Sequence, residues 1–117
     1  MVTWMRELLS TPAREFPEFP VALAYLPLLT PEDASAQLQR RVQALEAEWQ
    51  RIDELLRIHS AELHRLFLIE MEYLHTTLHS ELVWVRTLVD DLESGRLTWR
   101  REDAPESGAQ EVVEDEG

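Results

Sequence analysis

Between residues 32 and 94 the apolar positions recur at alternating intervals of four and three residues, the spacing of one helix face. The same segment contains neither glycine nor proline, the residues that most often interrupt helices. A repeat of about 3.5 residues is typical of helices that pack as coiled coils. A first stripe consists of Leu38, Val42, Leu45, Trp49, Ile52, Leu56, His59, Leu63 and Leu66, and a second of Phe67, Met71, Leu74, Leu78, Glu81, Val85, Leu88 and Leu92.

Capping residues mark the two ends of this helical segment. Thr30 is a favourable N-cap, and Pro31 suits the first helical position, where its missing N–H costs nothing. Glu32 and Asp33 carry negative charge at the positive end of the helix dipole. Gly95 follows the last helical residue, where a left-handed residue commonly ends a helix.

The two stripes lose phase near residues 63–67, which leaves two geometries open. One is a continuous helix, roughly 95 Å long at about 1.5 Å per residue. The other is a break near residues 58–64, with Ser60 as N-cap of a second helix. We expect the break, and therefore an all-α fold built on an antiparallel hairpin of helices at about 31–58 and 61–94.

Composition divides the chain into three parts. Residues 1–30 are expected to form a helix stub and an ordered strap rich in proline and aromatic residues, with one short helical turn at Val21–Leu26. Residues 31–100 form the predicted helical domain. Residues 101–117 are acidic and lack aromatic residues, so we expect a disordered tail.

The segment from Glu81 to Leu92 is apolar around most of the helix circumference, which predicts neighbours on several sides. A hairpin within one short chain does not supply that many neighbours. We therefore expect a homodimer with a two-fold helical interface. The predicted interface residues are Leu78, Leu82, Val85, Leu88, Val89 and Leu92.

Charge and composition exclude several classes of function. The formal net charge is −12, from 23 acidic residues and 11 arginines, so direct binding to nucleic acid is not expected. The chain has no cysteine, which excludes disulfides and thiolate metal sites. No apolar run is long enough to span a membrane, and no signal peptide is apparent, so we expect a cytoplasmic protein. Nucleophile and phosphate-binding motifs are also missing, and we expect neither an enzyme nor a cofactor.

The histidines offer an alternative function. His75 and His79 lie one helical turn apart, and Glu72 precedes His75 in an E-x-x-H pattern used by metal-binding helical bundles. Glu70 adds a further carboxylate. A metal-binding bundle built on Glu72, His75 and His79 is therefore the second hypothesis, although exposed or interface positions are the commoner use of such histidines.

Glu81 and Trp84 are the candidate ligand-binding residues. Glu81 interrupts the second apolar stripe, where a buried, unpaired carboxylate is costly. It therefore lies at a rim position, forms an ion pair with Arg86 or an arginine of a partner, or provides the polar floor of a pocket. Trp84 can stack on a planar ligand, although aromatic residues at helical spacing more often anchor a core. With Leu88 these residues suggest a site for a small, mostly apolar aromatic compound at the dimer interface.

Four segments carry a resemblance to a known family. They are RELLSTPAREFPEFP at 6–20, ALAYLPLLTPED at 22–33, RLFLIEMEY at 65–73 and ELVWVRTLVDDLESGRLTW at 81–99. Together they resemble the C-terminal domain of PadR-like transcriptional regulators, and the last segment is the most specific.

The resemblance implies dimerisation and, as in some members of that family, the sensing of a small and often aromatic effector. It covers about residues 1–100 and includes no winged helix-turn-helix, the part of such regulators that holds DNA. Residues 2–9 resemble the last turns of the helix that leaves that domain. The resemblance therefore suggests a stand-alone or truncated regulator, with a full-length PadR-like protein as a possible heterodimer partner.

Overall fold

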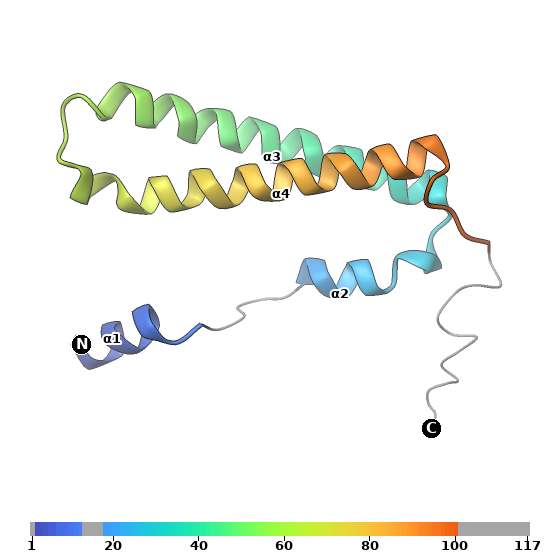
Figure 1. The fold of residues 1–117 in the computed structure, drawn as a ribbon, viewed down its shortest axis with the longest axis horizontal. Coiled ribbons are helices and arrows are strands. Elements are labelled where there is room, and N and C mark those ends of the chain that lie inside the picture. Colours follow the sequence, from blue (N-terminus) through green and yellow to red (C-terminus); the bar gives the residue numbers. More distant parts are fainter. Residues whose placement is uncertain (1, 13–17, 101–117) are drawn as a thin grey trace.

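The computed structural model describes residues 2–12 and 18–100, and every regular element in these ranges is a helix. Figure 1 shows two long helices side by side and antiparallel, with shorter helices beside them. This arrangement confirms the all-α hairpin and rules out the continuous helix. The elements are α1 (Val2–Ser10), α2 (Glu18–Ala24), the 3-10 helix η1 (Leu26–Leu28), α3 (Pro31–His59), the 3-10 helix η2 (Arg65–Leu68) and α4 (Ile69–Ser94).

The hairpin begins and ends at the residues that the sequence marks. The Thr30 hydroxyl accepts a hydrogen bond from the Asp33 backbone N–H at 3.0 Å, and Pro31 occupies the first turn. Gly95 ends α4 in the left-handed conformation, with φ of 82°. Leu97 N–H then donates to the Asp91 carbonyl at 3.0 Å, which satisfies one of the last carbonyls of the helix.

The turn between the long helices lies in the predicted region, but the second helix begins later than predicted. Ser60 does not cap it, because Ser60 has helical dihedral angles and instead ends α3. The His59 carbonyl accepts from the N–H groups of both Glu62 and Leu63, which closes the turn. His64 is extended, and its Nδ1 accepts from the Leu66 N–H at 3.0 Å, so an imidazole starts η2 and delays α4 to residue 69.

The hydrophobic core lies toward the open end of the hairpin, where α3 begins and α4 ends. Phe19 and Leu26 of the strap pack against this core, and the Trp99 indole N–H donates to the Leu29 carbonyl at 2.9 Å. In place of the single helical turn predicted at Val21–Leu26, the strap forms the two short helices α2 and η1. Residues 13–17 and the predicted disordered tail, 101–117, lie outside the described residues. The buried core cluster is Ala34, Leu38, Val85, Val89 and Leu92.

The face of α4 that packs on α3 differs from the predicted second stripe. Leu82 and Val89 are buried, although neither belongs to that stripe. Leu74, which does belong to it, is 37% exposed. The apolar residues around α4 permit more than one seam, and packing against α3 and the strap selects the one that runs through Leu82, Val85, Val89 and Leu92.

Helix α1 lies apart from the hairpin core. Figure 1 shows it below the closed end of the hairpin, where α3 turns into α4, and all nine of its residues are exposed. Among the described residues, no helix combines the length and the apolar character required to cross a membrane.

Candidate functional site

Four of the six predicted interface residues lie inside the single chain. Val85 is fully buried, and Leu82, Val89 and Leu92 are nearly so, because they face α3 and the strap. This corrects their expected position at a dimer interface: buried side chains have no surface to offer a second chain. The remaining two, Leu78 and Leu88, are half-buried, and Leu88 packs against the core cluster.

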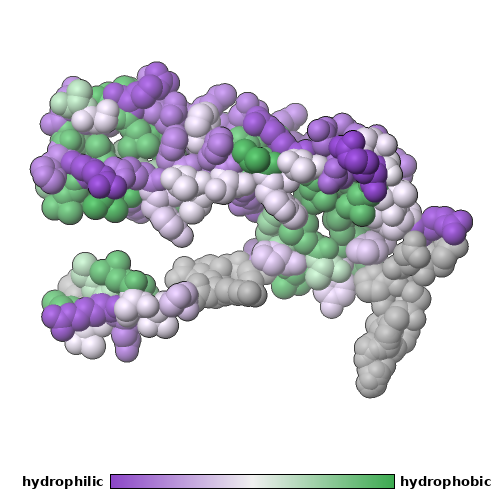
Figure 2. Space-filling model, viewed as in Figure 1, coloured by the Kyte–Doolittle hydropathy of each residue, from purple (hydrophilic) through white to green (hydrophobic). Residues whose placement is uncertain are grey.

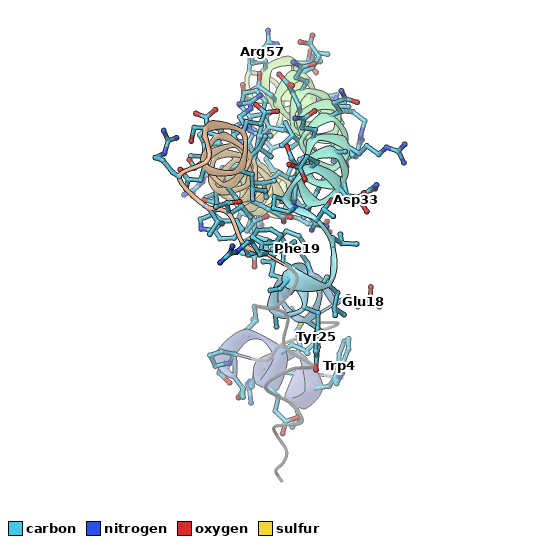
Figure 3. The ribbon with its side chains drawn as sticks, turned by 90° about the vertical axis from the view of Figure 1, so that its right-hand side faces the viewer. Trp4, Glu18, Phe19, Tyr25, Asp33 and Arg57 are labelled. Carbon is cyan, nitrogen blue, oxygen red and sulfur yellow. The ribbon has the colours of Figure 1, made fainter. Side chains whose placement is uncertain are left out.

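Glu81 is paired within the chain. Its carboxylate accepts from the guanidinium of Arg41 on α3, so Glu81 forms an ion pair, but with Arg41 rather than with Arg86. Arg86 pairs instead with Glu46 at 3.1 Å. The Arg41 guanidinium also lies over the Phe19 ring, 3.5 Å from its centroid, and Figure 3 shows Phe19 pointing from α2 toward the hairpin. Arg41 therefore joins the strap, α3 and α4 through a cation–π contact and an ion pair.

The predicted ligand residues do not share a cavity in the single chain. Trp84 is 51% exposed, whereas Glu81 is occupied by Arg41 and Leu88 packs toward the core. Two cavities lie nearby, and none of these three residues lines either of them. A groove of about 430 Å³ between α3 and α4 is lined by Gln39, Val42, Gln43, Arg86, Thr87, Val89 and Asp90. An apolar pocket of about 230 Å³ lies between the strap and α3.

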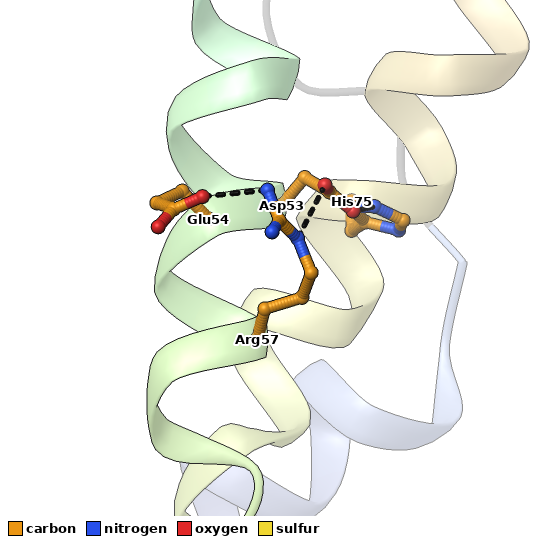
Figure 4. Close-up of polar contacts among 4 residues, drawn as sticks. All are labelled: Asp53, Glu54, Arg57 and His75. Atoms are coloured by element: carbon orange, nitrogen blue, oxygen red, sulfur yellow. Dashed lines mark hydrogen bonds and ion pairs between the residues drawn. The ribbon is translucent and has the colours of Figure 1, made fainter.

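The histidines of the alternative hypothesis serve contacts across the hairpin. His75 donates from Nε2 to Oδ1 of Asp53 at 2.9 Å, and its ring centroid lies 5.1 Å from that of Trp49. His79 also lies beside Trp49, at 5.7 Å between ring centroids. Figure 4 shows Asp53 between His75 and Arg57, and these two hydrogen bonds, His75 foremost, hold the pKa of Asp53 below its ordinary value.

Glu72, the third candidate ligand, is held by Arg65 through hydrogen bonds of 2.9 to 3.1 Å. This contact lowers the pKa of Glu72. In the part of the chain that the structure describes, no three histidine, aspartate or glutamate side chains gather in a way that holds a metal ion. The metal-binding hypothesis therefore has no ligand cluster within these residues.

Exposed apolar side chains form two surfaces that the sequence analysis did not single out. The first, the closed-end patch, surrounds the turn of the hairpin, and the second, the α1 face, covers one side of α1. Figure 2 shows hydrophobic surface at both places. The loss of phase near residues 63–67 was the available signal, because a turn there takes Leu63, Leu66 and Phe67 out of the contact between the helices, although the two stripes include them. The closed-end patch comprises Ile58, Leu63, Leu66, Phe67 and Ile69, and the α1 face comprises Val2, Trp4, Met5, Leu8 and Leu9.

These two surfaces are the strongest candidates for a functional site among the described residues. Every side chain in them is at least 44% exposed, and Leu9 reaches 80%. Contiguous apolar surface of this kind usually marks a place where another molecule binds. No protein-family model, curated protein or solved structure gives a match to this chain.

Proposed function

We propose that this chain is an interaction module that forms a homodimer, comparable to the C-terminal domain of PadR-like transcriptional regulators. The observation that carries the proposal is the apolar surface left uncovered on α1 and at the closed end of the hairpin. Full burial of one large aliphatic or aromatic side chain contributes about 1.5 to 3 kcal/mol. Ten such side chains therefore provide a substantial driving force for association, even after the entropic cost of binding.

The proposed role is regulatory and cytoplasmic, and it is exerted by association rather than by catalysis. The chain pairs with a second copy of itself or with a full-length PadR-like relative. In the second case the dimer contains only one DNA-binding domain. Because dimeric regulators bind two half-sites, loss of one DNA-binding domain removes much of their specific affinity. The acidic composition supports a role that involves no DNA contact by these residues.

Sedimentation equilibrium at micromolar concentration tests the homodimer. The expected mass is twice the 13.7 kDa of one chain. A folded monomer at all concentrations up to about 100 µM, corresponding to association weaker than roughly −5.5 kcal/mol, would contradict the proposal. A mobility-shift assay with the promoter DNA of the gene that encodes this chain is the companion measurement. We expect no specific shift.

A second candidate function is the sensing of a small aromatic compound, and the half-exposed ring of Trp84 favours it. In a dimer, two Trp84 rings and two Glu81 carboxylates would flank such a ligand, provided that each Glu81 leaves Arg41. The expected result is quenching of tryptophan fluorescence by aromatic compounds, which Trp84→Ala abolishes while the protein stays folded and dimeric. A response unchanged in Trp84→Ala, or no response in the wild type, would exclude this site.

A further inference from the structure

Within the described residues, no side chain of helix α1 is buried against the rest of the chain. It is nine residues long, and Val2, Trp4, Met5, Leu8 and Leu9 are all more than half exposed. An isolated helix shorter than about 12 residues is marginal in water, because few hydrogen bonds offset the cost of nucleation. A stable α1 therefore requires a surface that covers its apolar face.

The closed-end patch has the properties of that surface. Leu66 and Phe67 are its most exposed members, at 64% and 72%, and the patch is formed by the turn and the adjoining ends of α3 and α4. It thus presents a rigid support with apolar side chains from two helices. Within the described residues, neither α2 nor η1 covers it, since the strap packs on the core at the open end.

Charge allows an ion pair between the two surfaces, although α1 carries the carboxylate of Glu7 beside the cation of Arg6. Arg6 on α1 is exposed and has no ion-pair partner among the described residues. Glu62 in the turn and Glu70 at the start of α4 are likewise exposed and unpaired within the described part of the chain. Docking of α1 on the closed-end patch would bring a free cation to the two free carboxylates that border the patch.

We propose that α1 of one chain docks on the closed-end patch of a second copy, and that the exchange is reciprocal. Although α1 lies below the closed end in its own chain (Figure 1), its apolar side chains remain in water there. A two-fold axis lets two copies cover both surfaces with the same contact, so the interface is closed. This inference rests on the proposed homodimer and specifies which surfaces form it.

The absence of natural cysteine allows a direct test by disulfide cross-linking. Two single variants, Leu9→Cys and Phe67→Cys, are mixed and oxidised, and the products are weighed by mass spectrometry. A mixed disulfide between the two variants is expected. The control replaces Phe67→Cys with Val83→Cys, an exposed apolar position on α4 outside the patch, where no enrichment of the mixed disulfide is expected.

A chain that carries both Leu9→Cys and Phe67→Cys distinguishes docking of α1 on a second copy from docking of α1 on its own chain. Disulfides between chains support the proposal, whereas a disulfide within one chain, formed at the same rate on dilution, overturns it. Equal cross-linking at Val83→Cys also overturns it, because random collision then explains the product.

Dimer affinity provides the second measurement. Leu8→Ser with Leu9→Ser should weaken the dimer at least about tenfold, since two exposed apolar contacts are lost. Val83→Ser should leave the affinity within about twofold. Helix content from circular dichroism should fall by no more than the nine residues of α1, because all three side chains are exposed. If the wild type dimerises and the double variant dimerises equally well, the exchange is wrong while the proposed function stands; a monomeric wild type contradicts both.

Discussion

At the scale of single residues, polar pairs between α3 and α4 set the alignment of the hairpin. Arg41 forms an ion pair with Glu81, and Arg86 forms one with Glu46. His75 hydrogen-bonds to Asp53. Each pair joins residues far apart in sequence, and each is partly exposed. Their individual contributions to stability are therefore small, but together they favour one register of the two helices over its neighbours.

Arg41 links α3 to both α4 and the strap, so Arg41→Met should be the most costly of the surface arginine substitutions. It removes the ion pair with Glu81 and the cation–π contact with Phe19, and we expect a loss of about 1 kcal/mol in the free energy of unfolding. Urea denaturation measures this loss. Arg51→Met is the control, because Arg51 pairs only with Glu48 on its own helix, and it should cost less than about 0.5 kcal/mol. Equal losses in the free energy of unfolding of the two variants would contradict a role for Arg41 in docking the strap.

The contact between His75 and Asp53 predicts a dependence of stability on pH. The pKa of Asp53 is lowered in the folded chain, so its ionised form stabilises the fold above the pKa of the unfolded chain. This contribution is lost as the pH falls through the lowered pKa, below the ordinary aspartate value of about 3.9. His75→Gln weakens the contact and should therefore destabilise the fold at pH 5 more than at pH 2.5.

Denaturation followed by circular dichroism at the two pH values checks this prediction. His59→Gln is the matched control, since the His59 side chain has no hydrogen-bond partner among the described residues. A loss of stability in His75→Gln that is the same at both pH values would show that packing against Trp49, rather than ionisation of Asp53, is what the substitution removes.

At the scale of elements, the caps determine where the long helices begin and end. Thr30 and Gly95 act locally, and the structure has both ends where the sequence places them. The turn is different, because the His64 ring rather than the Ser60 hydroxyl organises the chain there. The histidine ring accepts a hydrogen bond from the backbone N–H two residues further along, and this contact competes locally with helix formation. Statistical preferences for helix-capping residues do not include such a contact.

Thr30→Ala tests the cap at the start of α3. It leaves the Asp33 N–H without its side-chain acceptor, and we expect a loss of about 1 kcal/mol in the free energy of unfolding, measured in urea. Thr76→Ala on the exposed surface of α4 is the control, and it should be neutral or slightly stabilising because alanine has the higher helix propensity. The same result for both variants would mean that the strap, and not the cap, fixes the start of α3.

At the scale of the whole molecule, apolar side chains are distributed unevenly along the hairpin. The open end buries the core cluster under the strap, whereas α1 and most apolar residues of the closed end, Leu68 excepted, are exposed to water. The open end therefore holds one chain together, and the closed end is left for association. Because the two roles lie at different ends of the hairpin, substitutions can disrupt folding and dimerisation independently.

Val85→Asp should unfold the chain rather than dissociate it. Val85 has no exposed surface, so the new carboxylate is buried without a partner, at a cost of about 3 kcal/mol or more. Val83→Asp is the control two residues away on the same helix, where the side chain is 47% exposed. Circular dichroism should show loss of helix in Val85→Asp and a native spectrum in Val83→Asp. A folded, monomeric Val85→Asp would place Val85 at the interface between chains instead.

The sequence by itself determined the helical class, the ends of the hairpin, the position of its break and the strap. These features follow from local chemistry: glycine and proline are missing from residues 32–94, Thr30 and Gly95 cap the helices, and prolines prevent a long helix in the strap. Local signals of this kind act over a few residues, and they are therefore visible without knowledge of the neighbours in space.

Only the tertiary structure decided which face of α4 is buried, which arginine pairs with Glu81 and where the uncovered apolar surface lies. The sequence showed a segment of α4 that is apolar around most of its circumference, and we expected Leu82, Val85, Val89 and Leu92 at a dimer interface. In the structure these residues are buried in the single chain. Arg41 and Glu81 are 40 residues apart, and Asp53 and His75 are 22 apart, so no local pattern connects them. Burial and ion pairing depend on two surfaces in contact. The sequence of one segment describes only one of those two surfaces.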